Sequence, residues 1–144
     1  MDKMHTTNYF NTFITAAPDS PVECSVVPSM RGDSKPVHLL VYELLQANPY
    51  TYTGDDVLFM TYVHRLGLST EEVEARRDEL WHELFSKPQA CLRSSALAKK
   101  YGWGFHFDDQ GRIRLIPMDS EDYTALSSGT DGLSVVPAMR SKRG

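Results

Sequence analysis

The sequence contains little cysteine and no long apolar run. Only Cys24 and Cys91 are cysteines among 144 residues, whereas secreted domains stabilised by disulfides carry many more. No apolar stretch approaches the roughly 20 residues that span a bilayer as a helix, and the opening MDKMHTTNYFNTF lacks the apolar segment of a signal peptide. We therefore expect a cytoplasmic protein without membrane contact and with two free thiols; a Cys24–Cys91 disulfide is the alternative.

Signatures of metal and nucleic-acid binding are missing as well. The five histidines form no HExxH, HxH or Cys/His pattern with the spacing of metal ligands. The formal net charge is −4, which disfavours a nucleic-acid partner because nucleic-acid-binding domains are usually basic. Positive charge gathers at the end of the chain, where Arg140, Lys142 and Arg143 fall within the last five residues. We expect no metal and no cofactor.

The periodicity of the apolar residues predicts several helices. The three longest are expected over residues 37–47, 55–66 and 70–86, with shorter helices over 94–101 and 120–126. Thr53 with Asp56, and Ser69 with Glu72, have the spacing of capping boxes before the second and third helices. Gly67 suits the C-terminal cap between them.

Strand patterns flank these helices. Residues 11–16 read as a strand, and residues 105–118 as a hairpin with its turn at 108–111. Residues 25–27 read as a short edge strand. The order of elements predicts an α+β fold, in which a small antiparallel sheet packs against three to four helices in a single compact domain. We assign residues 1–126 to this domain and 127–144 to a Gly/Ser linker and basic tail that can dock back on it.

Four stretches resemble a known family. They are MHTTNYFNTFITAAPDSP, NPYTYTGDDVLF, CLRSSALAKKYGWGFHFDDQGRIRL and MRSKRG. In order and spacing they are similar to a family of small uncharacterised proteins, a domain of unknown function, found in bacteria and some fungi. Ser20 and Gly54 depart from its pattern, which has Cys and Ser there. The resemblance covers nearly the whole chain and implies one compact domain, but it implies no activity, cofactor or site residue.

The densest cluster of candidate site residues begins at Arg93. Ser94 and Ser95 stand at an expected helix start, where unpaired N–H groups and a neighbouring guanidinium favour a phosphate or carboxylate. The alternative is that serine only caps the helix and Arg93 pairs with an acidic neighbour. Further along, Tyr101 and Trp103 lie among glycines and offer a stacking surface for a planar ligand. For Trp103 the alternative is a place in the core.

Three other residues are weaker candidates, in this case for catalysis. Cys91 precedes the expected helix start and an arginine, a setting that can make a thiol reactive, but the favoured interpretation is a buried, inert thiol. His106 alternates with two phenylalanines and therefore faces away from them. If its strand packs on the helix of His64, the two imidazoles converge as general acid and base. The alternative is that His106 is a solvent-facing ring.

Two nearly identical segments stand close to the two ends of the chain. SVVPSMR occupies residues 25–31 and SVVPAMR occupies residues 134–140. Seven residues are too few for a folding repeat. Three interpretations stay open: the segments pair as neighbouring edge strands, both are linear motifs for one protein partner, or the match is coincidence.

These observations lead to three functional hypotheses. The leading one is a metal-free domain that binds a small anionic or planar ligand between sheet and helices, with Arg93 holding the anion and Trp103 lining the apolar wall. Arg112 or Arg114 would add charge. The second is a cofactor-independent enzyme with a histidine acid/base, and the third is a protein-interaction module using residues 25–31 and 134–140.

Overall fold

The computed structural model describes residues 5–130 and 132–140. The elements are, in chain order, β1 (Thr12–Thr15), α1 (Val37–Ala47), α2 (Gly54–Leu66), α3 (Thr70–Ala75), α4 (Arg77–Phe85), the 3₁₀ helix η1 (Leu92–Ser94), α5 (Ala96–Lys100), β2 (Trp103–Phe107), β3 (Ile113–Pro117), α6 (Glu121–Ser127) and β4 (Ser134–Pro137). The fold is α+β and forms one compact domain, as predicted. Within the described ranges, no helix has the length and apolar character needed to cross a membrane.

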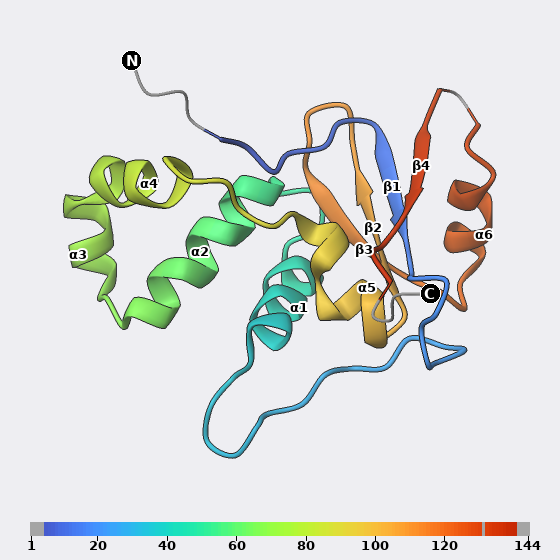
Figure 1. Cartoon of the computed structure of the whole chain (residues 1–144), viewed down its shortest axis with the longest axis horizontal. Helices are drawn as coiled ribbons and strands as arrows, with labels where there is room; N and C mark the ends of the chain where they lie inside the picture. The colour runs from blue at the N-terminus through green and yellow to red at the C-terminus, as the bar shows by residue number, and fades with distance from the viewer. Residues whose placement is uncertain (1–4, 131, 141–144) are drawn as a thin grey trace.

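The strands form a mixed sheet in the order β3-β2-β1-β4 (Figure 1). β2 pairs in antiparallel fashion with β1 and with β3, so the predicted hairpin is confirmed. β4 instead pairs in parallel with β1, with Ser134 opposite Thr12 and Val136 opposite Ile14. The prediction of a purely antiparallel sheet is therefore wrong at this edge. The chain leaves β3 at one edge of the sheet, passes through α6 and adds β4 at the other edge, beside β1.

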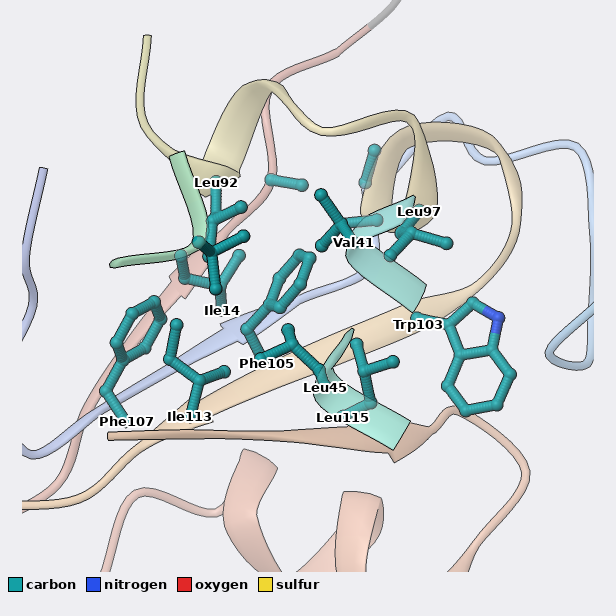
Figure 2. Packing of buried hydrophobic residues seen from close by; sticks show 14 residues of the cluster. Ile14, Val41, Leu45, Leu92, Leu97, Trp103, Phe105, Phe107, Ile113 and Leu115 are labelled. Atoms are coloured by element: carbon teal, nitrogen blue, oxygen red, sulfur yellow. The ribbon is translucent and has the colours of Figure 1, made fainter. Parts of the chain in front are cut away.

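The main core fills one face of the sheet (Figure 2). Phe105, Phe107, Ile113 and Leu115 point from β2 and β3 toward α1 and α5, and each is at most 3% exposed. The opposite face of the sheet is covered in part by α6, where the ring of Tyr123 meets that of Phe13 edge-on at 5.1 Å between centroids. Successive side chains along each strand thus point alternately to the main core and to the face of the sheet that α6 covers in part.

The helices α2, α3 and α4 extend away from the sheet and have a second core (Figure 1). We call residues 54–85 the helical arm. Phe59, Leu80, Leu84 and Phe85 are buried within it. The single helix predicted over 70–86 is interrupted at Arg76, whose φ of −119° and ψ of 20° are not helical. The break separates α3, which has no buried residue, from α4, which packs on α2.

Two further predictions need correction. Residues 25–27 are not a strand. The Val26 N–H donates to Tyr101 O at 2.9 Å, and the Val26 carbonyl accepts from the Trp103 indole N–H. Isolated hydrogen bonds therefore hold this segment, instead of the regular hydrogen-bond ladder of a strand. The helix predicted over 94–101 is shorter, because Ser95 has extended backbone angles and divides η1 from α5.

Of the two predicted capping boxes, the one at α2 is confirmed, whereas at α3 the bond from the Glu72 N–H to the Ser69 hydroxyl is the half that is found. Thr53 and Asp56 form both bonds of a capping box at α2, and the side chain of Ser69 caps α3. Gly67 ends α2 with a left-handed φ of 72°, which glycine adopts without steric cost. Both cysteines carry free thiols. Lys142 and Arg143 of the predicted basic tail lie outside the described residues.

Candidate functional site

A pocket of about 270 Å³ lies between α1, α2 and the segment that leads into α5. We call it the α1–α2 pocket. Its walls are mostly apolar and include Val41, Val57 and Leu92. The polar side chains that line it are His38, Thr61, Cys91, Ser94 and Ser95. It therefore includes three residues singled out in the sequence, Cys91, Ser94 and Ser95, whereas Arg93, Tyr101 and Trp103 do not line it.

Arg93 is engaged by the C-terminal segment. Its Nε donates to the carbonyl of Pro137 at 2.8 Å, and the Met139 N–H donates to the Arg93 carbonyl at 2.9 Å. The partner of the guanidinium is thus a backbone carbonyl of β4, instead of the anion or the acidic neighbour expected from sequence. Ser94 is drawn in the same direction, since its hydroxyl donates to the sulfur of Met139 at 3.2 Å.

Ser95 acts as a helix cap. Its hydroxyl accepts from the Leu97 N–H at 3.2 Å and so satisfies one of the unpaired donors at the start of α5. Because α5 has only five residues, its contribution to anion binding through a helix dipole is small. The capping interpretation of Ser95 agrees with this geometry, and anion binding by Arg93, Ser94 and Ser95 stays a prediction.

Trp103 belongs to the core. It is 5% exposed, and its indole N–H donates to the Val26 carbonyl at 2.8 Å. In Figure 2 it stands at the end of the main cluster, and its ring lies 5.3 Å from that of Tyr42. The core alternative therefore describes Trp103, because a buried ring with its donor paired offers no face to a ligand.

His38, like Thr61, lines the pocket without being marked by the sequence patterns. Its ring stacks on Tyr101, with 4.9 Å between centroids and 26° between planes. Burial lowers the pKa of His38, and the nearby cations Arg31 and Lys100 lower it further. The imidazole is accordingly neutral at pH 7, with a ring nitrogen that donates and another that accepts.

Cys91 is hydrogen-bonded to a tyrosine from the N-terminal segment. The Tyr9 hydroxyl and the Cys91 sulfur are 3.0 Å apart. Burial and then the contact with Cys91 raise the pKa of Tyr9 to about 12, against the opposing influence of Arg93. The phenol therefore stays protonated at neutral pH, and the pair ties the N-terminal segment to the wall of the pocket.

The N-terminal segment is anchored by Asp55, the second residue of α2. This 8% exposed carboxylate accepts from the Thr6 hydroxyl at 2.7 Å, the Thr7 N–H at 2.7 Å and the Thr7 hydroxyl at 2.8 Å. The Asp55 N–H donates to the side chain of Asn8 at 2.9 Å. At Gly54 an added Cβ would lie 3.1 Å from Thr7 O, so the small residue permits this close approach.

The two candidate catalytic histidines lie in different parts of the structure. His106 faces away from the main core, where its Nδ1 is 2.7 Å from the Tyr50 hydroxyl. Burial lowers the pKa of His106, with a smaller effect of Arg114 in the same direction and of Asp108 in the other. His64 is exposed near the end of α2, beside Leu68 and Val73 of the helical arm. Neither histidine lines the α1–α2 pocket.

The fold and the pocket define a single-domain α+β protein whose candidate site lies between helices. Residues 4–144 match the family described as "Family of unknown function (DUF6157)", and the chain belongs to this family. The family resemblance predicted from sequence is thereby confirmed. No curated protein and no solved structure matches the chain.

Proposed function

We propose that the α1–α2 pocket binds a small, largely apolar molecule that carries a neutral hydrogen-bonding group. The observation that supports this proposal is the lining, in which apolar side chains from α1 and α2 face a few polar groups. Pockets for small molecules have this composition, since apolar contact supplies affinity and a few polar groups fix orientation.

The electrostatics of the pocket favour a neutral ligand. Arg93, the cation nearest in sequence to the serines, is engaged with Pro137 and does not line the pocket. His38 is neutral at pH 7 because burial and neighbouring cations lower its pKa. A carboxylate placed here would lose its hydration without gaining a charged partner, which is costly. The leading hypothesis from sequence was an anionic or planar ligand, and the proposal retains the planar ligand but not the anionic one.

A titration with three probes tests the proposal. Indole, benzyl alcohol and benzoate are each added to the full chain, and backbone amide shifts are followed by NMR. Indole and benzyl alcohol are expected to shift the amides of residues 37–41 and 91–96, whereas benzoate is expected to have a weaker effect. Stronger binding of benzoate than of the neutral probes would contradict a neutral site.

Two matched variants locate the binding. Ala90 lines the pocket and is exposed, so Ala90→Trp places a large ring at its mouth. Ala125, exposed on α6, accepts the same substitution away from the pocket. Ala90→Trp is expected to weaken indole binding by roughly tenfold or more, since the ring occupies the volume of the ligand, while Ala125→Trp leaves it unchanged. Equal affinity in both variants would move the binding elsewhere.

A further inference from the structure

The helical arm carries a second hollow, separate from the α1–α2 pocket. A groove of about 380 Å³ lies between α2, α3 and the first residue of α4. Its apolar wall includes Met60, Val63, Leu68 and Val73, and Arg77 lies at its edge. The groove thus combines an apolar floor with one guanidinium.

The guanidinium of Arg77 is held by aromatic rings. Its central carbon lies 5.0 Å from the centroid of Phe59 and 6.0 Å from that of Trp81. Stacking of this kind orients an arginine fork before any anion arrives, so less rotamer entropy is lost on binding.

Two adjacent arginines have opposite surroundings. Arg76 forms an ion pair with Glu79 at 3.1 Å, and it does not line the groove. Among the residues that the structure describes, no carboxylate lies within ion-pair distance of Arg77. Of the two arginines, the one that faces the groove, Arg77, is therefore the one without an ion-pair partner.

Two carboxylates do border this region, and neither lies within ion-pair distance of Arg77. Asp56 lines an adjoining hollow of about 330 Å³ that also reaches Arg77, but its Oδ2 accepts from the Thr53 N–H at 3.0 Å within the capping box. Glu74 lines the groove itself at the end of α3. His64 is the other titratable group there and is exposed to solvent. The anion-accepting position is thus on the Arg77 side.

We propose that this groove binds a small carboxylic acid with an apolar chain. The carboxylate pairs with the preoriented guanidinium of Arg77, a charge-assisted interaction that suits its two-pronged geometry. The chain covers Met60, Val63, Leu68 and Val73, which gain apolar burial. The site is separate from the α1–α2 pocket and prefers an anionic ligand, whereas that pocket prefers a neutral one.

Octanoate and octanol provide the test, because they share an apolar chain and differ in charge. Each is titrated into the full chain at pH 7, and dissociation constants are obtained from amide shifts of residues 60–77. Octanoate is expected to bind roughly tenfold more tightly than octanol, since a charge-assisted hydrogen bond is about twice as strong as a neutral one. Equal or tighter binding of octanol would overturn the proposal.

Substitution of the two neighbouring arginines gives the matched control. Arg77→Gln is expected to weaken octanoate binding by roughly tenfold, and Arg76→Gln to leave it unchanged, because only the first faces the groove. Both side chains are exposed, so both variants keep the fold. Butyrate is expected to bind more weakly than octanoate, as less apolar surface is buried. Unchanged octanoate affinity in Arg77→Gln, or equal losses in both variants, would overturn the proposal.

Discussion

The two segments SVVPSMR and SVVPAMR adopt different structures although six of their seven letters agree. The first, at residues 25–31, lies outside the sheet. Its Ser25 hydroxyl donates to Gly102 O and accepts from the Met118 N–H at 2.8 Å. The second, at residues 134–140, contains β4 and pairs with β1. Nearly identical sequences thus make isolated tertiary hydrogen bonds in the first segment and the hydrogen-bond ladder of a strand in the second.

The position at which the segments differ corresponds to their different burial. Ser29 of the first is exposed, whereas the equivalent Ala138 of the second is 2% exposed and belongs to the main core. The prolines show the reverse: Pro28 is buried and Pro137 is exposed. Tertiary neighbours therefore decide the conformation, as they commonly override strand propensity.

Both segments nevertheless hold the same stretch of chain. The first bonds to the chain between α5 and β2, through Val26 with Tyr101 and with Trp103, the first residue of β2. The second bonds to η1, through Pro137 with Arg93. η1 and the start of α5 form one wall of the α1–α2 pocket, so the second segment bonds directly to that wall, whereas the first bonds to the chain that follows α5. Their direct pairing, one of the three possibilities left open by the sequence, is not found, because residues 25–27 form no strand and β4 pairs with β1.

The largest expected effect breaks the comparison at its differing position. Ala138→Asp would bury an unpaired carboxylate and is expected to lower the free energy of unfolding by about 3 kcal/mol. Ser29→Asp, at the equivalent exposed position, is expected to change it by less than about 0.5 kcal/mol. Urea unfolding of the two variants checks the difference, and equal losses would show that the segments are equally buried.

A smaller effect is expected at the first letter of each segment. Ser25→Ala removes one hydrogen bond from the Met118 N–H and one from the Gly102 carbonyl, which keep the 3.3 Å bond to each other, and is expected to cost about 1 kcal/mol. Ser134 is exposed in β4, so Ser134→Ala is expected to be nearly neutral. Urea midpoints at equal slope distinguish the two; a larger loss for Ser134→Ala would reverse the assignment.

The smallest effect concerns Arg93 and stays local. Arg93→Ala removes the bond to the Pro137 carbonyl and is expected to cost about 0.5–1 kcal/mol. Hydrogen exchange is expected to accelerate at the Ala138 and Met139 amides, which hold β4 to β1 and η1, with no change at Val26. Faster hydrogen exchange at the Val26 amide alone would mean that Arg93 stabilises residues 25–31 instead of β4.

Local sequence signals predicted the elements whose bonds are local. The helix caps and the hairpin depend on hydrogen bonds between residues that are close in sequence, and they are found as expected. They are the caps at Thr53 with Asp56, at Ser69 and at Gly67, and the 105–118 hairpin. The broken helix at Arg76 and the parallel pairing of β4 were not predictable in this way. The helix break depends on the tertiary packing of α4, and the pairing of β4 depends on which strand of the sheet has an unpaired edge.

The candidate site divides along the same line. Cys91, Ser94 and Ser95 line the pocket as residues of one short stretch, so proximity in sequence could mark them. His38 and Thr61 come from α1 and α2, and only the tertiary structure brings them there. For Trp103 the sequence left a stacking surface and a core position open, because its hydrogen-bond partner, Val26, is 77 residues away.

The most direct test of the central claim uses the two cysteines of the chain. Cys91 lines the α1–α2 pocket, whereas Cys24 is exposed and does not line it. Alkylation by iodoacetamide is followed at each thiol by peptide mass spectrometry, with and without saturating indole. A ligand in the pocket predicts slower alkylation of Cys91 and an unchanged rate at Cys24. An unchanged rate at Cys91, or equal slowing at both thiols, would contradict binding in the pocket.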